Sequence, residues 1–398
     1  MTDTTSLVHL LLMLAAVLLT TRALSVLAER LGQPAILGEL IGGVLLGASV
    51  LGILDPNDLA IHTLAQLGLL ILLFEIGLAT DLGALTKVAG TATVIAFVGV
   101  LLPFVFGYAA LSAMGISRLP AIVCAAALTA TSIGISTRVL AELGFLQTDE
   151  GRVVLGAAVL DDIIGLVILS VIGTFAAGTA ITATGIVRTS AIAFGFVVVA
   201  LVIGRFLVPP LFHAAKRLRS PTTIAVMGLA FAFSLAALAG FLGSAIIVGG
   251  FVAGVLLNRI DQRDDVQRSA AAMGSLLTPI FFASVGASVD LRALAEPRTM
   301  LVTLVLLVAG VVGKIIAAYV PVWFKGNKAL IGTAMLPRGE VELIVAQTGL
   351  AIGALDASLF GAITLMVLLT TLLAPPLIQA VAKRDPRARE LMPAKAGG

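Results

Sequence analysis

The sequence predicts an all-α, polytopic membrane protein with about 13 transmembrane helices. Of its 398 residues, 59% are hydrophobic and only 12% are charged, and the mean hydropathy is +1.13. A soluble domain of this size has about 25% charged residues. Apolar runs of roughly 20 residues, each long enough to cross the hydrocarbon core of a bilayer, recur from Leu7 to Ala382. Because these runs are continuous and do not alternate, they predict helices and not the strands of a barrel.

The expected helices are joined by short loops that contain Gly, Pro or charged residues. No soluble domain fits between them, and a short basic tail over residues 383–398 is expected after the last helix. The predicted spans are 7–29, 35–53, 61–79, 90–113, 119–141, 153–176, 183–208, 222–239, 241–258, 270–288, 299–323, 328–353 and 357–382.

The basic residues give the expected orientation. Sixteen of the 25 Lys and Arg residues fall in loops on one side of the membrane, and four fall on the other. Such a bias marks the cytoplasmic side, so we expect a multi-pass protein of the inner (plasma) membrane with its N-terminus outside and its C-terminus in the cytoplasm. The pI near 9.2 therefore reflects topology and does not indicate a nucleic-acid partner. The single Cys124 and three scattered histidines indicate no disulfide, metal centre or cofactor.

Two of the predicted helices contain segments that favour an interruption. The span 119–141 contains the polar stretch Thr131-Ser132 followed by Gly134, and the span 328–353 contains Pro337-Arg338-Gly339. Proline removes a backbone donor, and such segments unwind where protein or water surrounds them. The two spans lie seven helices apart, so they cross the membrane in opposite directions, as an inverted repeat requires. The alternative, an ordinary loop at 335–342, would disturb the charge bias downstream.

Ionisable residues of several spans fall at one depth in the membrane. Asp161 follows Arg152 by nine residues, so it lies roughly 14 Å from the cytoplasmic end of its helix. Lys314 precedes Lys325 by eleven residues, or roughly 16 Å. A charge near the bilayer centre costs about 2.5–3.5 kcal/mol or more, and stability gives no reason for a second, adjacent carboxylate at Asp162. We therefore expect a functional site at this depth.

The chemistry of the adjacent aspartates follows from helix geometry. Neighbouring helical side chains point about 100° apart, so Asp161 and Asp162 cannot share one partner equally. One can pair with Lys314 while the other faces a cavity, where it holds a small cation when ionised and releases it when protonated. Hydroxyls of Thr131 or Ser132 and carbonyls freed in the interrupted helices would complete the coordination of the cation. A purely structural alternative pairs one aspartate with Lys314 and uses the other as a helix cap.

Other charged positions have weaker assignments. Lys314 is either only a counter-ion or also a proton carrier. Arg338 and Glu340 are expected to form a structural charge pair where the interrupted helices cross, and Glu340 or Glu342 is an alternative contact for the ion path. Glu75 has no assigned role. The two glycine-rich runs, 38–47 and 249–254, indicate tight helix packing.

Taken together, these motifs resemble bacterial Na+/H+ antiporters of the cation:proton antiporter superfamily, in the branch containing NapA. The resemblance runs nearly end to end, with one departure: relatives often have an acid after Gly77-Leu78, where this chain has Ala79. The motifs that carry it are Gly32-Gln33-Pro34, Thr129-Ala130-Thr131-Ser132, Leu160-Asp161-Asp162, Lys314 and Met335-Leu336-Pro337-Arg338-Gly339-Glu340.

The resemblance implies an NhaA-like fold and a homodimer in lipid. It implies core helices at about 61–176 and 270–382, and panel helices for the dimer at about 7–53 and 183–258. It also implies that Asp162 binds Na+ (or Li+) and protons, with Asp161 beside it as the partner of Lys314. Electrogenic exchange of two protons for one Na+, and a role in pH homeostasis, go with this pattern.

Three other functions compete with this one. A K+/H+ antiporter has the same fold, but its glutathione-gated relatives carry a nucleotide-binding domain that is not expected here. A proton-independent symporter related to bile-acid carriers would not need Lys314 beside Asp161. An intramembrane aspartic protease needs two carboxylates from separate helices, which adjacent residues cannot supply.

Overall fold

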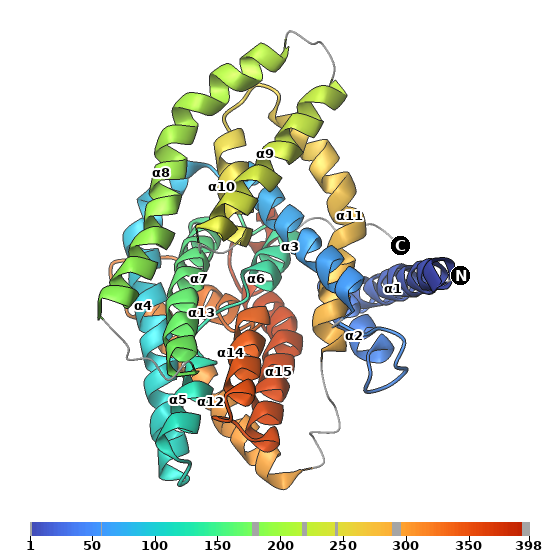
Figure 1. The fold of residues 1–398 in the computed structure, drawn as a ribbon. Coiled ribbons are helices and arrows are strands. Elements are labelled where there is room, and N and C mark those ends of the chain that lie inside the picture. Colours follow the sequence, from blue (N-terminus) through green and yellow to red (C-terminus); the bar gives the residue numbers. More distant parts are fainter. Residues whose placement is uncertain are drawn as a thin grey trace. The chain divides into compact units, whose positions relative to one another are not determined.

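The computed structural model describes residues 2–56, 58–176, 183–216, 221–242, 246–288 and 296–391. All regular secondary structure in these ranges is helical (Figure 1). The helices are α1 (Thr2–Arg30), α2 (Ala35–Leu46), α3 (Leu59–Ala79), α4 (Leu82–Ala113), α5 (Arg118–Ala126), α6 (Ile133–Glu142), α7 (Asp149–Ala176), α8 (Ala183–Lys216), α9 (Pro221–Phe241), α10 (Ile246–Leu257), α11 (Arg263–Ala287), α12 (Pro297–Tyr319), α13 (Lys328–Ala334), α14 (Glu340–Ala351), α15 (Ala357–Ala382) and α16 (Ala388–Leu391).

Within the described ranges, eight helices are long and apolar enough to cross a membrane, and three more are apolar but shorter. The all-helical, multi-pass fold predicted from the sequence is therefore confirmed, whereas length and composition do not fix the count at thirteen spans. The eight are Leu7–Arg30, Leu59–Ala79, Gly83–Ala113, Phe194–His213, Thr223–Phe241, Arg263–Ala287, Pro297–Tyr319 and Ala357–Ala382.

Some helix ends differ from the predicted ones. The span expected at 35–53 stops as a helix at Leu46, because Gly47 takes an extended conformation with φ −68° and ψ 174°. The span expected from residue 90 begins eight residues earlier, at Leu82. Apolar composition locates the segment of a helix that crosses the hydrocarbon core of the bilayer. The helix itself continues beyond that segment when the flanking residues also favour helical structure.

The chain forms two compact units. Unit one consists of Met1–Pro56, Lys87–Ala180 and Phe282–Gly398, and unit two of Asn57–Thr86 and Ile181–Phe281. The expected core and panel helices are defined by their roles in transport and dimerisation, not by compactness. That division stays a prediction.

Unit two is organised around α10, which packs against α3, α9 and α8. The contact with α3 depends on Gly77 and Gly254. A Cβ on Gly77 would collide with the carbonyl oxygen of Phe251, and a Cβ on Gly254 with that of Phe74. Small residues let transmembrane helices approach this closely, so the packing role predicted for the second glycine-rich run is confirmed at Gly254.

In unit one, α7 contacts α6, α13 and α14, while α15 packs against α12, α13 and α14 (Figure 1). The interrupted pairs α5–α6 and α13–α14 therefore lie against both α7 and α15. This arrangement brings the polar segments of three distant parts of the sequence together.

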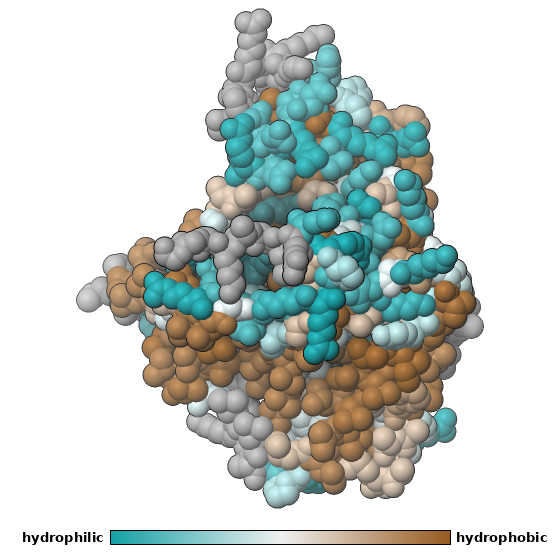
Figure 2. All heavy atoms as spheres, turned by 180° about the vertical axis from the view of Figure 1, so that it is seen from behind, coloured by the Kyte–Doolittle hydropathy of each residue, from teal (hydrophilic) through white to brown (hydrophobic). Residues whose placement is uncertain are grey.

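Helix α12 shows how unit one separates an apolar surface from a polar interior. Aliphatic residues spaced three or four apart are exposed on one side, and Lys314 is buried on the other. Such a stripe suits contact with lipid. Figure 2 shows hydrophobic residues covering broad, continuous areas of one face of the molecule. The exposed stripe of α12 is Leu301, Leu304, Val308, Val312 and Ile316.

Candidate functional site

The two helix interruptions expected from the sequence are present and contact each other. The backbone N–H of Ser132, just before α6, donates to the carbonyl oxygen of Pro337 at 2.8 Å. The hydroxyl of Ser136, in the first turn of α6, donates to the carbonyl oxygen of Ala334 at the end of α13 at 2.5 Å. Each interruption thus supplies hydrogen-bond partners that the other lacks, which is the condition for unwound backbone at membrane depth.

Arg338 occupies the centre of this crossing and is fully buried. Its Nη1 donates to the carbonyl oxygen of Ala130 and lies 3.9 Å from Oε1 of Glu342. The carbonyl oxygen of Arg338 accepts from the hydroxyl of Thr371 on α15 at 2.7 Å. The guanidinium therefore places a positive charge against the carbonyl groups exposed where α5 ends.

Glu342 is the acid that the described residues place beside Arg338. Its Oε2 accepts from the backbone N–H of Gly339 at 2.8 Å, so it also caps the start of α14. The expected pairing of Arg338 with Glu340 concerns a side chain outside the described residues. A negative charge near a helix N-terminus is favourable, which accounts for the capping role of Glu342.

Asp161 is the meeting point of three elements. Its Oδ2 accepts from Lys314 Nζ of α12 at 2.7 Å and from Thr131 Oγ1 of the α5–α6 interruption at 2.8 Å. Thr131 Oγ1 also lies 3.4 Å from the carbonyl oxygen of Met335. The other carboxylate oxygen, Oδ1, has no hydrogen-bond partner among the residues that the structure describes. Asp161 is therefore bound to the ammonium group of Lys314 and to Thr131 of one interrupted helix. Through Thr131 it is also connected to the second interrupted helix.

Asp162 follows on α7 and is only 5% exposed. Its side chain leaves the helix about 100° away from that of Asp161. The structure thus brings four of the predicted site residues, Asp161, Lys314, Thr131 and Arg338, into one connected group with Asp162 adjacent to it.

Within the described residues, the side chains of Ser132 and Glu75 are not part of this connected group. The side chain of Ser132 lies beside Gly339, where an added Cβ would come within 3.0 Å of the serine Oγ. Ser132 therefore contributes its backbone to the crossing, and its hydroxyl faces the start of α14. Glu75 is half-buried on α3, in unit two.

Several residues of the site were not selected from the sequence. Ser136 and Thr371 join the interrupted segments, and both are buried hydroxyls. Gly99 of α4 makes room for Lys314, because an added Cβ would lie 3.3 Å from its Cδ and 3.4 Å from Nζ. Buried hydroxyls at membrane depth would have been a usable signal for the first two. Gly99 resembles every other glycine in an apolar run.

The chemistry available here is that of hard oxygen ligands. In the described parts of the chain, no three His, Cys, Asp or Glu residues come together as a metal cluster. A cation held at Asp162 would therefore draw its remaining ligands from hydroxyl and carbonyl oxygens or water, which small hard cations accept. Lys314 and Arg338 supply positive charge beside Asp161 and Glu342.

Comparisons with known proteins agree on one family. Residues 13–384 match the family model described as sodium/hydrogen exchanger, transmembrane. The high-affinity Na(+)/H(+) antiporter NhaS3 of Synechocystis is 36% identical, with 88% of this chain and 85% of that protein covered. The Na(+)/H(+)-K(+) antiporter GerN of Bacillus cereus is 33% identical, with 92% and 94% covered. A Na(+)/H(+) antiporter of Enterococcus hirae is 30% identical, with 93% and 97% covered.

A solved structure supports the fold. The sodium proton antiporter MjNhaP1 from Methanocaldococcus jannaschii superposes with a TM-score of 0.69 over 97% of this chain and 100% of that one. At 17% sequence identity, this likeness concerns the arrangement of the helices.

Proposed function

This chain belongs to the sodium/hydrogen exchanger family and exchanges Na+ for protons, and we propose that it does so by alternating access, with Asp162 holding either ion. One observation supports this site above all. Two adjacent buried carboxylates lie beside two helix interruptions, and one of them, Asp161, is held by Lys314. Stability does not require a second carboxylate at this depth.

The division of labour between the two aspartates supports antiport. Asp161 is held by Lys314 and Thr131, so its charge is balanced without a transported ion. Asp162 can then be neutralised in turn by Na+ or by a proton. A carboxylate that accepts one of the two but never both couples their movements, provided that the site opens to one side of the membrane at a time.

The same proposal includes the features that go with the family resemblance. They are thirteen spans, two inverted repeats and a homodimer in the inner membrane with the N-terminus outside. The charge bias of the loops supports the span count and the orientation. Exchange is electrogenic if two protons return for each Na+, which requires a second proton carrier beside Asp162. Lys314 is the candidate, because breaking its pair with Asp161 would leave a buried ammonium group free to lose its proton.

Selectivity for K+ is the second candidate function. One relative is named a Na(+)/H(+)-K(+) antiporter, at 33% identity over most of both chains. Competition between Na+, Li+ and K+ in proteoliposomes would separate the two readings.

The test of the proposal uses everted membrane vesicles with a pre-set pH gradient. Adding Na+ or Li+ should dissipate the gradient in vesicles that contain the unmodified chain, and Asp162→Asn should abolish this response. Asp149→Asn is the matched control, because Asp149 lies on the same helix but is exposed and paired with Arg152. Unaltered exchange by Asp162→Asn would overturn the assignment.

A further inference from the structure

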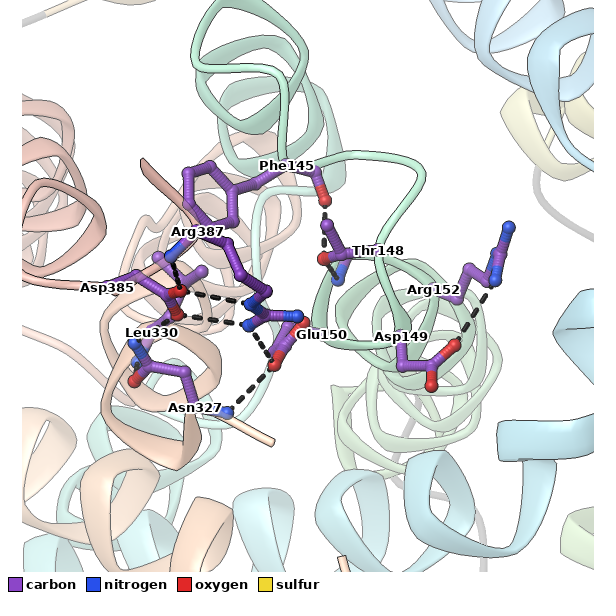
Figure 3. A network of polar contacts seen from close by, with 10 residues as sticks. Phe145, Thr148, Asp149, Glu150, Arg152, Asn327, Leu330, Asp385 and Arg387 are labelled. Carbon is purple, nitrogen blue, oxygen red and sulfur yellow. Dashed lines mark hydrogen bonds and ion pairs between the residues drawn. The ribbon is translucent and has the colours of Figure 1, made fainter. Parts of the chain in front are cut away.

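The segment that follows α15 folds back onto the first turn of α7 (Figure 3). Arg387 Nη2 donates to Oε1 of Glu150 at 2.7 Å. The same oxygen accepts from the backbone N–H of Asn327, which precedes α13, at 2.8 Å. Glu150 thus connects three segments that are far apart in the sequence.

A second carboxylate holds the arginine in place. Asp385 Oδ1 accepts from the backbone N–H and Nε of Arg387, each at 3.0 Å. Asp385 Oδ2 accepts from Nη2 of Arg387 and from Nδ2 of Asn327, also at 3.0 Å each. Paired, charge-assisted hydrogen bonds of this kind fix the orientation of a guanidinium group. We call Glu150, Asn327, Asp385 and Arg387 the tail latch.

The burial of these side chains is uneven. The side chain of Glu150 is 1% exposed and that of Asp385 3%, whereas that of Arg387 is 44% exposed. Oε2 of Glu150 has no hydrogen-bond partner among the described residues. Removing the positive partner of a buried carboxylate is costly, so Glu150 depends on Arg387 much more than Arg387 depends on Glu150.

Each latched segment leads to the ion site. Helix α7 carries Asp161 eleven residues after Glu150, or about 17 Å along the helix. Asn327 caps α13 through its side chain, which accepts from the N–H of Leu330 at 3.0 Å, and α13 ends at the interruption. The tail continues α15, whose Thr371 binds the carbonyl of Arg338.

We propose that the tail latch is a positioning device for cation binding, in which Arg387 sets where α7 lies against α13 and thereby where Asp161 and Asp162 lie against the helix crossing. This rests on the proposed function of the aspartates. Titration of Asp385 is not the basis of this role, because the hydrogen bonds that it accepts from Arg387 lower its pKa to about 2.

The test compares Arg387→Gln with Arg384→Gln in proteoliposomes. Arg384 lies in the same tail and is exposed, so its replacement removes the same charge without touching the latch. Arg387→Gln should raise the KM for Na+ about tenfold, the low end of what losing an outer positioning group costs a metal site, and should shift the pH of half-maximal exchange. Arg384→Gln should leave both within about twofold of the unmodified chain, the spread expected of surface changes.

Arg387→Gln leaves the buried carboxylate of Glu150 without its guanidinium partner, so the variant risks instability. The double variant Glu150→Gln, Arg387→Gln removes both charges and is the fallback. Its KM should lie closer to that of the unmodified chain than the KM of Arg387→Gln does, because coupled residues are not additive. Equal KM values and equal pH profiles for Arg387→Gln and Arg384→Gln would overturn the latch. If Arg387→Gln yields no folded protein, a double variant with the KM and pH profile of Arg384→Gln would overturn it. Absence of Na+/H+ exchange by the unmodified chain would overturn the proposed function itself.

Discussion

Lys314 Nζ lies 2.7 Å from Oδ2 of Asp161, and both side chains are fully buried. An ion pair that far from water is not explained by stability, since a well-packed apolar pair is often as stable or more so. The pair is more simply explained by the effect that a change in the charge of one residue has on the other. Loss of either partner leaves the other uncompensated, so the protonation of one residue is tied to that of the other.

The first prediction concerns the charge carried per cycle. Lys314→Gln should weaken exchange or make it electroneutral, because the second proton carrier is lost. Charge movement is measured as current in proteoliposomes adsorbed to a solid support, alongside Na+ uptake. Lys325→Gln, at an exposed position after α12, is the control and should remain electrogenic. A fully electrogenic Lys314→Gln would show that the lysine carries no proton.

The second prediction concerns the hydroxyl of Thr131. Thr131→Val keeps the shape of the side chain but removes the hydrogen bond to Asp161, which at about 1.5–3 kcal/mol for a charged acceptor should weaken apparent Na+ affinity about tenfold or more. Thr131→Ser should restore most of it. Thr137→Val is the control, because within the described part of the chain the Thr137 hydroxyl bonds only carbonyls of its own helix, at 2.6 and 3.3 Å. Equal KM values for the two valine variants would contradict the prediction.

The third prediction concerns the space around Lys314. Gly99→Val should press on the lysine and reduce the exchange rate, with a loss of stability of about 1–3 kcal/mol from overpacking. Gly90→Val is the matched control, since an added Cβ at Gly90 of the same helix has nothing within 4 Å. Exchange rates and thermal unfolding of both variants provide the measurement. Identical behaviour of the two would show that Lys314 tolerates displacement.

The fourth prediction concerns acid. The pKa of Asp385 lies at about 2 in the folded chain, below its ordinary value, mainly because Arg387 donates hydrogen bonds to it. A depressed carboxyl pKa contributes stability above the ordinary pKa, and that stability is lost as pH falls through the folded value. A spin label at Arg384→Cys, with Cys124→Ala, should therefore show constant mobility from pH 9 to pH 5. A change in its mobility between pH 8 and pH 6 would contradict this.

The sequence predicts the pairing of Asp161 with Lys314 better than the contacts around it, and the reason is physical. Lipid penalises charge according to depth, so Asp161 and Lys314 could be placed at one level by counting residues from the loops. The helix interruptions were signalled by polar residues, Pro337 and Gly339 in apolar runs. The sequence does not predict the contact between Ser132 and Pro337, because a shared depth does not determine which segments touch.

Other features had no such constraint. Glu150 and Arg387 lie 237 residues apart, near the ends of the spans, where charge is ordinary and nothing marks a partner. The position of Glu342 beside Arg338 depends on how α14 is capped at Gly339. Glu340 and Glu342 both lie at the start of this helix, and their spacing does not show which of them approaches Arg338.

The separation of Glu150 from Arg387 also has a consequence for biosynthesis. At about 5–20 residues per second, a ribosome would need roughly 10–50 s to synthesise the residues between them. During that interval α7 has been made, but its buried carboxylate has no guanidinium to bind. Assembly of this end of the bundle can therefore finish only after translation of the last helix. A nascent chain that stalls before Arg387 would expose this defect to quality-control proteases.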